Sequence, residues 1–211
     1  MIVAIGVVLV VFLVIVACRC YWISTKVDKR TGRCKVLAVL GSGGHTTEML
    51  RLLSGLSERY QPIEYVIGES DKFSMEKCRR FEEERAKQSP RQHSFHHIVR
   101  SREVGQSWLS SFFSTVAACV AAVPTICRLK PDLVLCNGPG TCIPLCGIAY
   151  IYKILGIRSC RIVYVESLCR VESLSLSAKL LYWLRIANDL LVQWPELQKK
   201  YPRTKYIGLL V

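Results

Sequence analysis

The sequence lacks the signatures of several common protein classes. It contains no C-x-x-C pair, and no RNP-type or zinc-finger pattern accompanies its net charge of +13. Internal repeats and low-complexity segments are absent, and 211 residues leave no room for a second catalytic domain. We therefore expect one medium-sized domain, whose scattered positive charge indicates a surface that faces anionic lipid head groups or a diphosphate rather than nucleic acid.

Metal and disulfide sites are not indicated either. The eleven cysteines are odd in number, and several lie within apolar runs, where cysteines of a cytosolic domain act as small core hydrophobes. His96 and His97 are adjacent on an expected strand and therefore point to opposite faces, so they do not readily share one metal ion. We assign no metal and no cofactor.

The first apolar run is long enough to cross a membrane. Residues 2–18 carry no charge, and a helix over them would rise about 26 Å, or about 33 Å if it continued to Ile23. The hydrocarbon layer of a bilayer is about 30 Å thick. No basic residue precedes the run, which favours an uncleaved anchor over a signal peptide.

Basic residues follow this run and are opposed only by Asp28. They are Arg19, Lys26, Lys29, Arg30, Arg33 and Lys35. Such a flank is retained on the cytosolic side of a membrane. We expect a transmembrane anchor over residues 1–24, a basic linker over 25–34 and a cytosolic domain over 35–211.

Apolar runs then alternate with helical stretches, a pattern typical of a parallel sheet covered by helices. The expected strands are residues 35–40, 63–68, 94–99, 132–137, 160–166, 189–194 and 205–211. The expected helices are residues 45–56, 74–87, 107–129, 141–156 and 175–187. This order predicts an α/β, Rossmann-like, doubly wound sheet, in which ligands bind beyond the carboxyl ends of the strands.

The loop "GSGGH" at residues 41–45 follows the first expected strand and opens a helix, which is typical of an anion site. No lysine follows the glycines, so the loop is not a Walker motif, and Thr46 replaces the third glycine of a dinucleotide motif. His45 could act as a base, a hydrogen-bond donor or a helix cap. The hydroxyls of Thr46 and Thr47 could reach phosphate oxygens.

A second glycine turn follows the fourth expected strand. Asn137, Gly138 and Gly140 form it, and Thr141 supplies a hydroxyl at the start of the next helix. These residues either line the same groove as the first turn or only reverse the chain. For the neighbouring Pro139 and Pro144, chain reversal is the favoured interpretation.

Two further loops carry charge at the same rim. Glu166 follows the fifth expected strand and is either a general base, a contact to a sugar hydroxyl or an ion-pair partner of Arg170. Arg100 and Arg102 lie in a loop after the third expected strand, where they either meet phosphate or are simply solvated.

Several motifs carry a family resemblance: "GSGGHTTEMLRLL", "RSREVGQSW", "KPDLVLCNGPGTC", "VYVESLCRVESLSLS" and "VQWPELQKKYP". With them the chain resembles the membrane-anchoring subunit of the UDP-GlcNAc transferase of asparagine-linked glycosylation, which makes dolichyl-diphosphate chitobiose at the endoplasmic reticulum. More distantly, it resembles the acceptor-binding half of the bacterial transferase that adds GlcNAc to undecaprenyl-diphosphate-muramyl-pentapeptide. Both have the B-type glycosyltransferase fold of two facing Rossmann-like domains.

The resemblance implies roles for single residues. The bacterial motif "GGTGGH" falls on Gly41, Gly43, Gly44 and His45, and of the bacterial "HEQN" segment only Glu166 is matched. His45 and Glu166 are therefore the implied catalytic candidates. The implied contacts to the acceptor diphosphate are Gly41, Ser42, Gly43, Gly44, Thr46, Asn137, Gly138, Gly140, Thr141 and Arg102.

The resemblance also implies an inverting, metal-independent transfer to O4 of the acceptor sugar, dolichyl-diphosphate-GlcNAc. The donor would be held by a small cytosolic subunit that docks on residues 205–211, and the chain would be inactive alone. Two alternatives remain at this point: a purely structural recruiter with a vestigial pocket, or a membrane-tethered dinucleotide oxidoreductase in which Glu69 reads a ribose.

Overall fold

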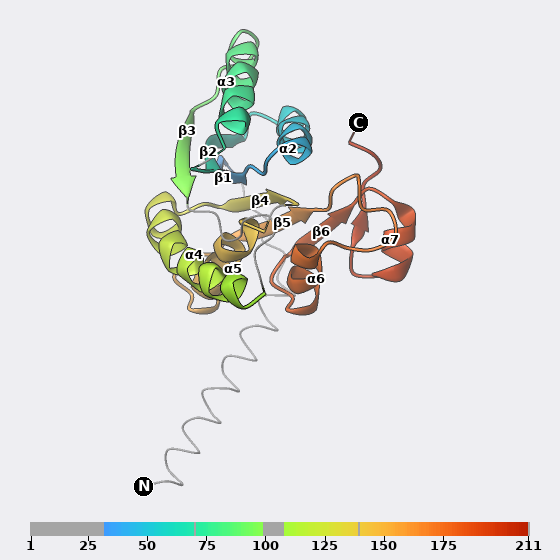
Figure 1. The fold of residues 1–211 in the computed structure, drawn as a ribbon. Helices are drawn as coiled ribbons and strands as arrows, with labels where there is room; N and C mark the ends of the chain where they lie inside the picture. The colour runs from blue at the N-terminus through green and yellow to red at the C-terminus, as the bar shows by residue number, and fades with distance from the viewer. Residues whose placement is uncertain (1–31, 70, 99–107, 139, 211) are drawn as a thin grey trace, which may run out of the picture.

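The computed structural model describes residues 32–69, 71–98, 108–138 and 140–210, and it contains one seven-stranded parallel sheet in the order β3-β2-β1-β4-β5-β6-β7 (Figure 1). The strands are β1 (Cys34–Val39), β2 (Tyr60–Gly68), β3 (His93–Ile98), β4 (Leu133–Asn137), β5 (Arg161–Val165), β6 (Asp189–Val192) and β7 (Lys205–Tyr206). The helices are α2 (Gly44–Ser54), α3 (Lys72–Ala86), α4 (Trp108–Leu129), α5 (Cys142–Ile154), α6 (Leu176–Trp183) and α7 (Pro195–Lys200). The doubly wound parallel sheet expected from the sequence is confirmed.

Helices cover both faces of the sheet, as Figure 1 shows with α2 and α3 on one side and α4, α5 and α6 on the other. Alternate residues of β1 pack into the two different helix layers. Val36 and Ala38 pack with Met49 of α2, whereas Leu37 and Val39 join the core beneath α4 and α5. This explains why β1 reads as a continuous apolar run, since a central parallel strand is buried on both faces.

The chain reverses its direction of travel across the sheet at β1. From β1 it proceeds to β2 and β3 on one side, and it returns to β4 on the other. In doubly wound sheets, this reversal opens a crevice beyond the carboxyl ends of the two central strands. The loops that follow β1 and β4 are the two glycine turns found in the sequence.

The C-terminal part differs from the expectation. The last predicted strand, residues 205–211, contributes only Lys205 and Tyr206 to the sheet, and the short helix α7 was not predicted. Ile207 still donates its N–H to the carbonyl of Val192, but Gly208 then turns the chain away with a φ of 78°. The expected strand at 189–194 likewise ends at Val192, because α7 begins at Pro195.

No helix among the described residues is long and apolar enough to cross a membrane. The expected anchor over residues 1–24 lies outside the described part of the chain. The anchor therefore stays a prediction from the sequence.

Candidate functional site

The first glycine turn is open to solvent at the carboxyl end of the central strand β1. Ser42, Gly43 and Gly44 are exposed, and Gly43 is the N-cap residue of α2 with a φ of 65°. It offers no side-chain cap, and the first N–H groups of a helix have no partner within the helix. The turn thus presents backbone donors and the positive end of a helix to a ligand, which is the arrangement of an anion site.

The buried hydroxyls of Thr46 and Ser74 hold this turn in place. Thr46 is fully buried, its hydroxyl donates to the carbonyl of Gly41, and it lies 2.7 Å from the hydroxyl of Ser74. Ser74 Oγ lies 3.2 Å from the same carbonyl, and its N–H donates to Asp71 Oδ1 at 3.1 Å. The Thr46 hydroxyl therefore donates its one hydrogen within the protein, and its expected contact with phosphate stays a prediction.

His45 joins the two glycine turns. Its Nδ1 lies 3.0 Å from Oδ1 of Asn137, the last residue of β4. Its ring also lies directly against Gly138, since a Cβ built on that glycine would be 2.1 Å from Cε1 of the imidazole. Gly138 has a φ of 74°, so glycine is favoured there by backbone conformation as well as by space. Lining one groove, rather than mere chain reversal, is the interpretation that this contact supports.

Glu48 lies at the centre of this network, although sequence reasoning missed it. Its carboxylate accepts hydrogen bonds from four groups, which come from the end of β4 and from the loops after β5 and β6. The donors are Asn137 Nδ2 at 3.0 Å, Ser167 Oγ at 2.8 Å, the N–H of Leu168 at 3.3 Å and Gln193 Nε2 at 3.2 Å. One signal was available in the sequence, because Glu48 follows His45 by three positions and so shares its face of α2.

Glu166, the other catalytic candidate, does not face the crevice. It is 1 % exposed, and its two oxygens accept the N–H groups of Ser167 at 3.1 Å and Ser175 at 2.7 Å. Burial raises the pKa of this carboxyl, while these hydrogen bonds and the charge of Arg170 act in the opposite direction. The carboxylate thus holds the loop 167–175 through two backbone N–H groups, and its catalytic role stays a prediction from the sequence.

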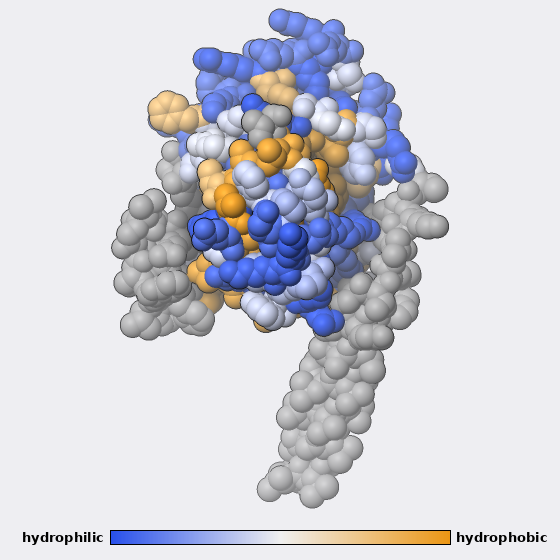
Figure 2. Space-filling view, turned by 90° about the vertical axis from the view of Figure 1, so that its right-hand side faces the viewer, coloured by the Kyte–Doolittle hydropathy of each residue, from blue (hydrophilic) through white to orange (hydrophobic). Residues whose placement is uncertain are grey.

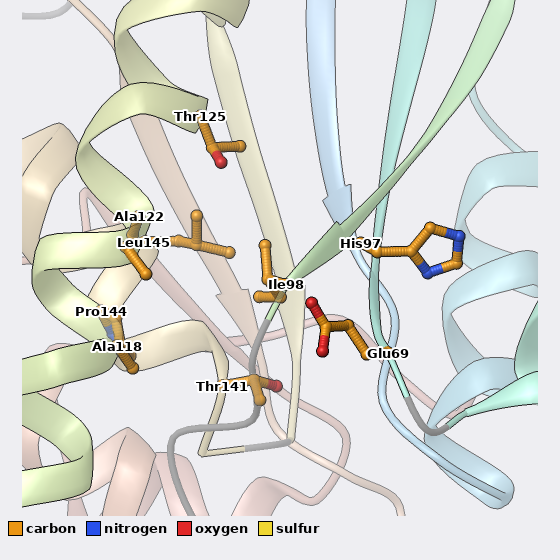
Figure 3. A pocket seen from close by; sticks show the side chains of 10 residues that line it. Glu69, His97, Ile98, Ala118, Ala122, Thr125, Thr141, Pro144 and Leu145 are labelled. Carbon is orange, nitrogen blue, oxygen red and sulfur yellow. The ribbon is translucent and has the colours of Figure 1, made fainter.

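The remaining predicted residues divide by location. Gly140 is exposed, and Thr141 lines a groove of about 210 Å³ between α4, α5 and the ends of β2 and β3. Figure 3 shows the carboxylate of Glu69 beside Ile98 and Thr141 in this groove, whereas the ring of His97 points away from α4 and α5. Arg102 lies outside the described residues.

The C-terminal segment, residues 207–210, lies against Gln193 and α2. Leu210 donates its N–H to Oε1 of Gln193 at 2.9 Å, and Arg51 of α2 donates to its carbonyl at 3.3 Å. Gln193 also donates to the carbonyl of Glu166 at 3.0 Å, in addition to its contact with Glu48. The segment 207–210 and Glu48 of α2 are therefore linked through one buried glutamine.

Comparisons with known proteins agree with this architecture. Among solved structures, the fold is similar to MurG of Acinetobacter baumannii, with a TM-score of 0.57 and 14 % identity over 83 % of this chain and 44 % of that chain. It is also similar to UGT89C1 of Arabidopsis thaliana in complex with UDP-L-rhamnose, with a TM-score of 0.51 and 13 % identity over 86 % of this chain and 53 % of that chain. The chain thus spans about half the length of these solved chains, and the likeness establishes a B-type glycosyltransferase-like fold.

Sequence relatives are much closer. The UDP-N-acetylglucosamine transferase subunit ALG14 of Homo sapiens is 51 % identical over 180 residues, which are 83 % of this chain and 82 % of the relative. The same subunit of Yarrowia lipolytica is 41 % identical over 178 residues, covering 84 % and 81 %. The family model described as "Oligosaccharide biosynthesis protein Alg14 like" matches residues 36–210. The chain therefore belongs to the Alg14 family of UDP-N-acetylglucosamine transferase subunits.

Proposed function

We propose that this chain is the membrane-anchoring and acceptor-binding subunit of a heteromeric transferase, which adds the second GlcNAc from UDP-GlcNAc to dolichyl-diphosphate-GlcNAc. The observation that carries the proposal is the exposed glycine turn at residues 42–44, which ends beside His45 at the reversal point of the sheet. Membership of the Alg14 family supports the sugar that is transferred, since its relatives are named as UDP-N-acetylglucosamine transferase subunits.

The backbone amides of residues 42–44 bind the diphosphate in this proposal. A helix N-terminus contributes typically about 0.3 to 1 kcal/mol to binding a negative group, and up to about 2 kcal/mol when partly buried. A diphosphate at a solvent-exposed turn needs more binding free energy than this, so cationic side chains must assist. Arg102 is our candidate from the sequence for this assistance.

His45 is the proposed general base. Its Nε2 takes the proton of the acceptor O4 hydroxyl, and that oxygen attacks C1 of the donor sugar from the face opposite to UDP. The bond between C1 and the UDP oxygen breaks with its electron pair going to UDP, so the configuration at C1 inverts. The placement of Glu166 in the interior favours His45 over Glu166 for this step.

A second subunit supplies the donor site in this proposal. The sequence relatives are named as subunits of a UDP-N-acetylglucosamine transferase, and B-type enzymes place the nucleotide sugar in the other of their two domains. We propose that a small cytosolic subunit docks at residues 205–211. Tyr206, Ile207 and Leu209 are exposed there, and Figure 2, which faces this side of the molecule, shows apolar residues between polar surroundings.

The surface of the helix layer formed by α4, α5 and α6 supports our proposal that the domain lies beside the endoplasmic reticulum membrane. Large apolar side chains are exposed on the outer helices α4, α5 and α6, including Val120, Ile151 and Trp183. With the apolar run at residues 2–18, this surface supports a single-pass protein whose site lies at the height of the lipid head groups. The alternative, a structural recruiter, shares this placement but lacks a working site.

Substitution of His45 by alanine tests the proposed function. In membranes that contain both subunits, His45→Ala is expected to lower the transfer of GlcNAc to dolichyl-diphosphate-GlcNAc roughly 100-fold or more, because a general base contributes about 10²- to 10⁴-fold. Co-purification of the cytosolic subunit should remain unchanged. The control is Ser54→Ala at the exposed end of the same helix, which should retain full activity.

Two outcomes decide between the functions. Loss of transfer with intact partner binding supports a working acceptor site in this chain. Undiminished transfer by His45→Ala would remove the assignment of the base and favour the structural recruiter.

A further inference from the structure

The geometry points to Glu48 as a positioning residue: we propose that its carboxylate acts through the amide of Asn137 to fix the tautomer of His45, so that Nε2 is the nitrogen that accepts a proton. The inference rests on the proposed function for the role of His45 in transfer. The arrangement of the three side chains is independent of that role, since it follows from their contacts alone.

Hydrogen bonds to neighbouring parts of the protein fix the location of Glu48. As a carboxylate it can only accept hydrogen bonds, and donors from the end of β4 and from the loops after β5 and β6 converge on it. Ser167 and Leu168 hold it from one side, and Gln193 holds it from another. The orientation of the Glu48 side chain relative to α2 is therefore fixed by contacts within the protein, and it does not depend on a bound ligand.

The second step is the orientation of the Asn137 amide. Asn137 is fully buried, and one end of its amide lies 3.0 Å from Glu48 Oε2 and 3.4 Å from the carbonyl of Val165. Both neighbours only accept hydrogen bonds, so this end must be the NH₂ group. The opposite end, Oδ1, then faces His45 and can only accept a hydrogen bond from it.

The third step is the tautomer of His45. A neutral imidazole carries one hydrogen, and the nitrogen that faces an acceptor must carry it. Because Nδ1 lies 3.0 Å from Oδ1 of Asn137, Nδ1 is protonated and Nε2 keeps its lone pair. The ring cannot turn toward Gly138, since that backbone already lies against it.

This arrangement resembles in its logic the carboxylate that orients the histidine of a serine protease triad. Here an amide stands between the carboxylate and the imidazole. When Nε2 gains a proton, the positive imidazolium retains its hydrogen bond to Asn137, and the negative charge of Glu48 lies one amide away.

The test uses the complete two-subunit complex in lipid nanodiscs, with ¹⁵N-labelled histidine in this chain. The signals of His45 are assigned by their absence in His45→Ala. In the wild type, Nδ1 is expected to give a protonated-type signal and Nε2 an unprotonated-type signal, from one dominant tautomer. The steady-state kcat and KM for the acceptor are measured in the same preparation.

Glu48→Leu keeps a side chain of similar length but removes the acceptor that faces Asn137. Only the carbonyl of Val165, at 3.4 Å, then favours one orientation of the Asn137 amide, so the constraint on this amide is weakened. Both His45 tautomers should then be populated, and kcat should fall roughly 10- to 100-fold with little change in KM, a part of the contribution of a general base. The control is Glu76→Leu, a glutamate exposed on α3 and paired with Arg80.

A rescue variant guards against a merely structural effect of Glu48→Leu. In Glu48→Leu with Asn137→Asp, the new carboxylate accepts directly from Nδ1 and cannot present a donor to it. A single tautomer and part of the lost kcat should return. If Glu48→Leu leaves both the ¹⁵N signals and kcat unchanged, or if wild-type His45 carries its hydrogen on Nε2, the inference is overturned. Full activity of His45→Ala would instead contradict the proposed function, and the tautomer signals would then decide this inference alone.

Discussion

Gly138→Ala is expected to abolish most GlcNAc transfer while the chain still binds its partner. The added Cβ would lie 2.1 Å from the imidazole Cε1 of His45, a distance that non-bonded atoms do not adopt. The ring or the loop must move, and a displacement of about 1 Å can cost roughly 100-fold in rate. The positive φ of 74° adds strain of roughly 1 to 3 kcal/mol for a residue with a side chain.

The chain offers a matched control in the helix that follows. Gly147 lies within α5, and a Cβ built there meets nothing within 4 Å among the described residues. Gly147→Ala should therefore keep full transfer and gain about 0.5 to 1 kcal/mol of stability from helix propensity. Comparable transfer rates for the two alanine variants would show that the contact between Gly138 and His45 has no role in the site.

Glu82→Ala is expected to give the largest loss of stability, about 3 to 5 kcal/mol, because it leaves a buried positive charge without its counter-ion. Glu82 of α3 is 3 % exposed and accepts from both Tyr65 and Arg85. Among the described residues, Nε and Nη1 of Arg85 already have no hydrogen-bond partner. Burial and the neighbouring carboxylate raise the pKa of Tyr65, so its hydroxyl stays protonated as a donor to Glu82.

The free energy of unfolding of the purified protein, measured by thermal unfolding in detergent, checks this prediction. For a chain of this size, the loss corresponds to a fall in Tm of roughly 6 to 20 °C. Glu83→Ala on the exposed face of the same helix should change stability by less than about 0.5 kcal/mol. Removing both charges with Glu82→Met and Arg85→Met should recover most of the loss, and a double variant as unstable as Glu82→Ala would argue against the ion pair as the cause.

The stability of α3 also matters for the site. Ser74 near the start of this helix donates its hydroxyl to the carbonyl of Gly41 in the glycine turn, and Asp71 accepts the N–H of Ser74. A protein that loses the packing of α3 on β2 should therefore lose order in the turn as well. This connects the buried Glu82 to the anion site, although the two are separated along the helix.

The positions of the strands along the chain and the existence of both glycine turns could be predicted from the sequence because they depend on local patterns. Apolar runs bounded by glycine and a helical period require only neighbouring residues. The position of His45 at a strand-to-helix junction followed in the same way. Membership of the Alg14 family then replaced the dinucleotide alternative, which rested on the glycine turn and Glu69 alone.

The contacts of Glu48 could not be predicted because they are not local. Its partners Ser167 and Gln193 lie 119 and 145 positions further along the chain, and only the strand order brings them to one edge of the sheet. The orientation of Thr46 and Glu166 also depends on tertiary packing. Both follow apolar strands at positions typical of ligand contacts, yet the protein uses their oxygens to satisfy its own backbone.

The most direct test of the account is a structure of the complete two-subunit complex in a lipid nanodisc with dolichyl-diphosphate-GlcNAc bound. We predict that phosphate oxygens lie within hydrogen-bond distance, about 3 Å, of the backbone amides of residues 42–44. It also predicts O4 of the acceptor sugar facing Nε2 of His45. A diphosphate seated away from this turn, with His45 facing no part of the acceptor, would contradict it.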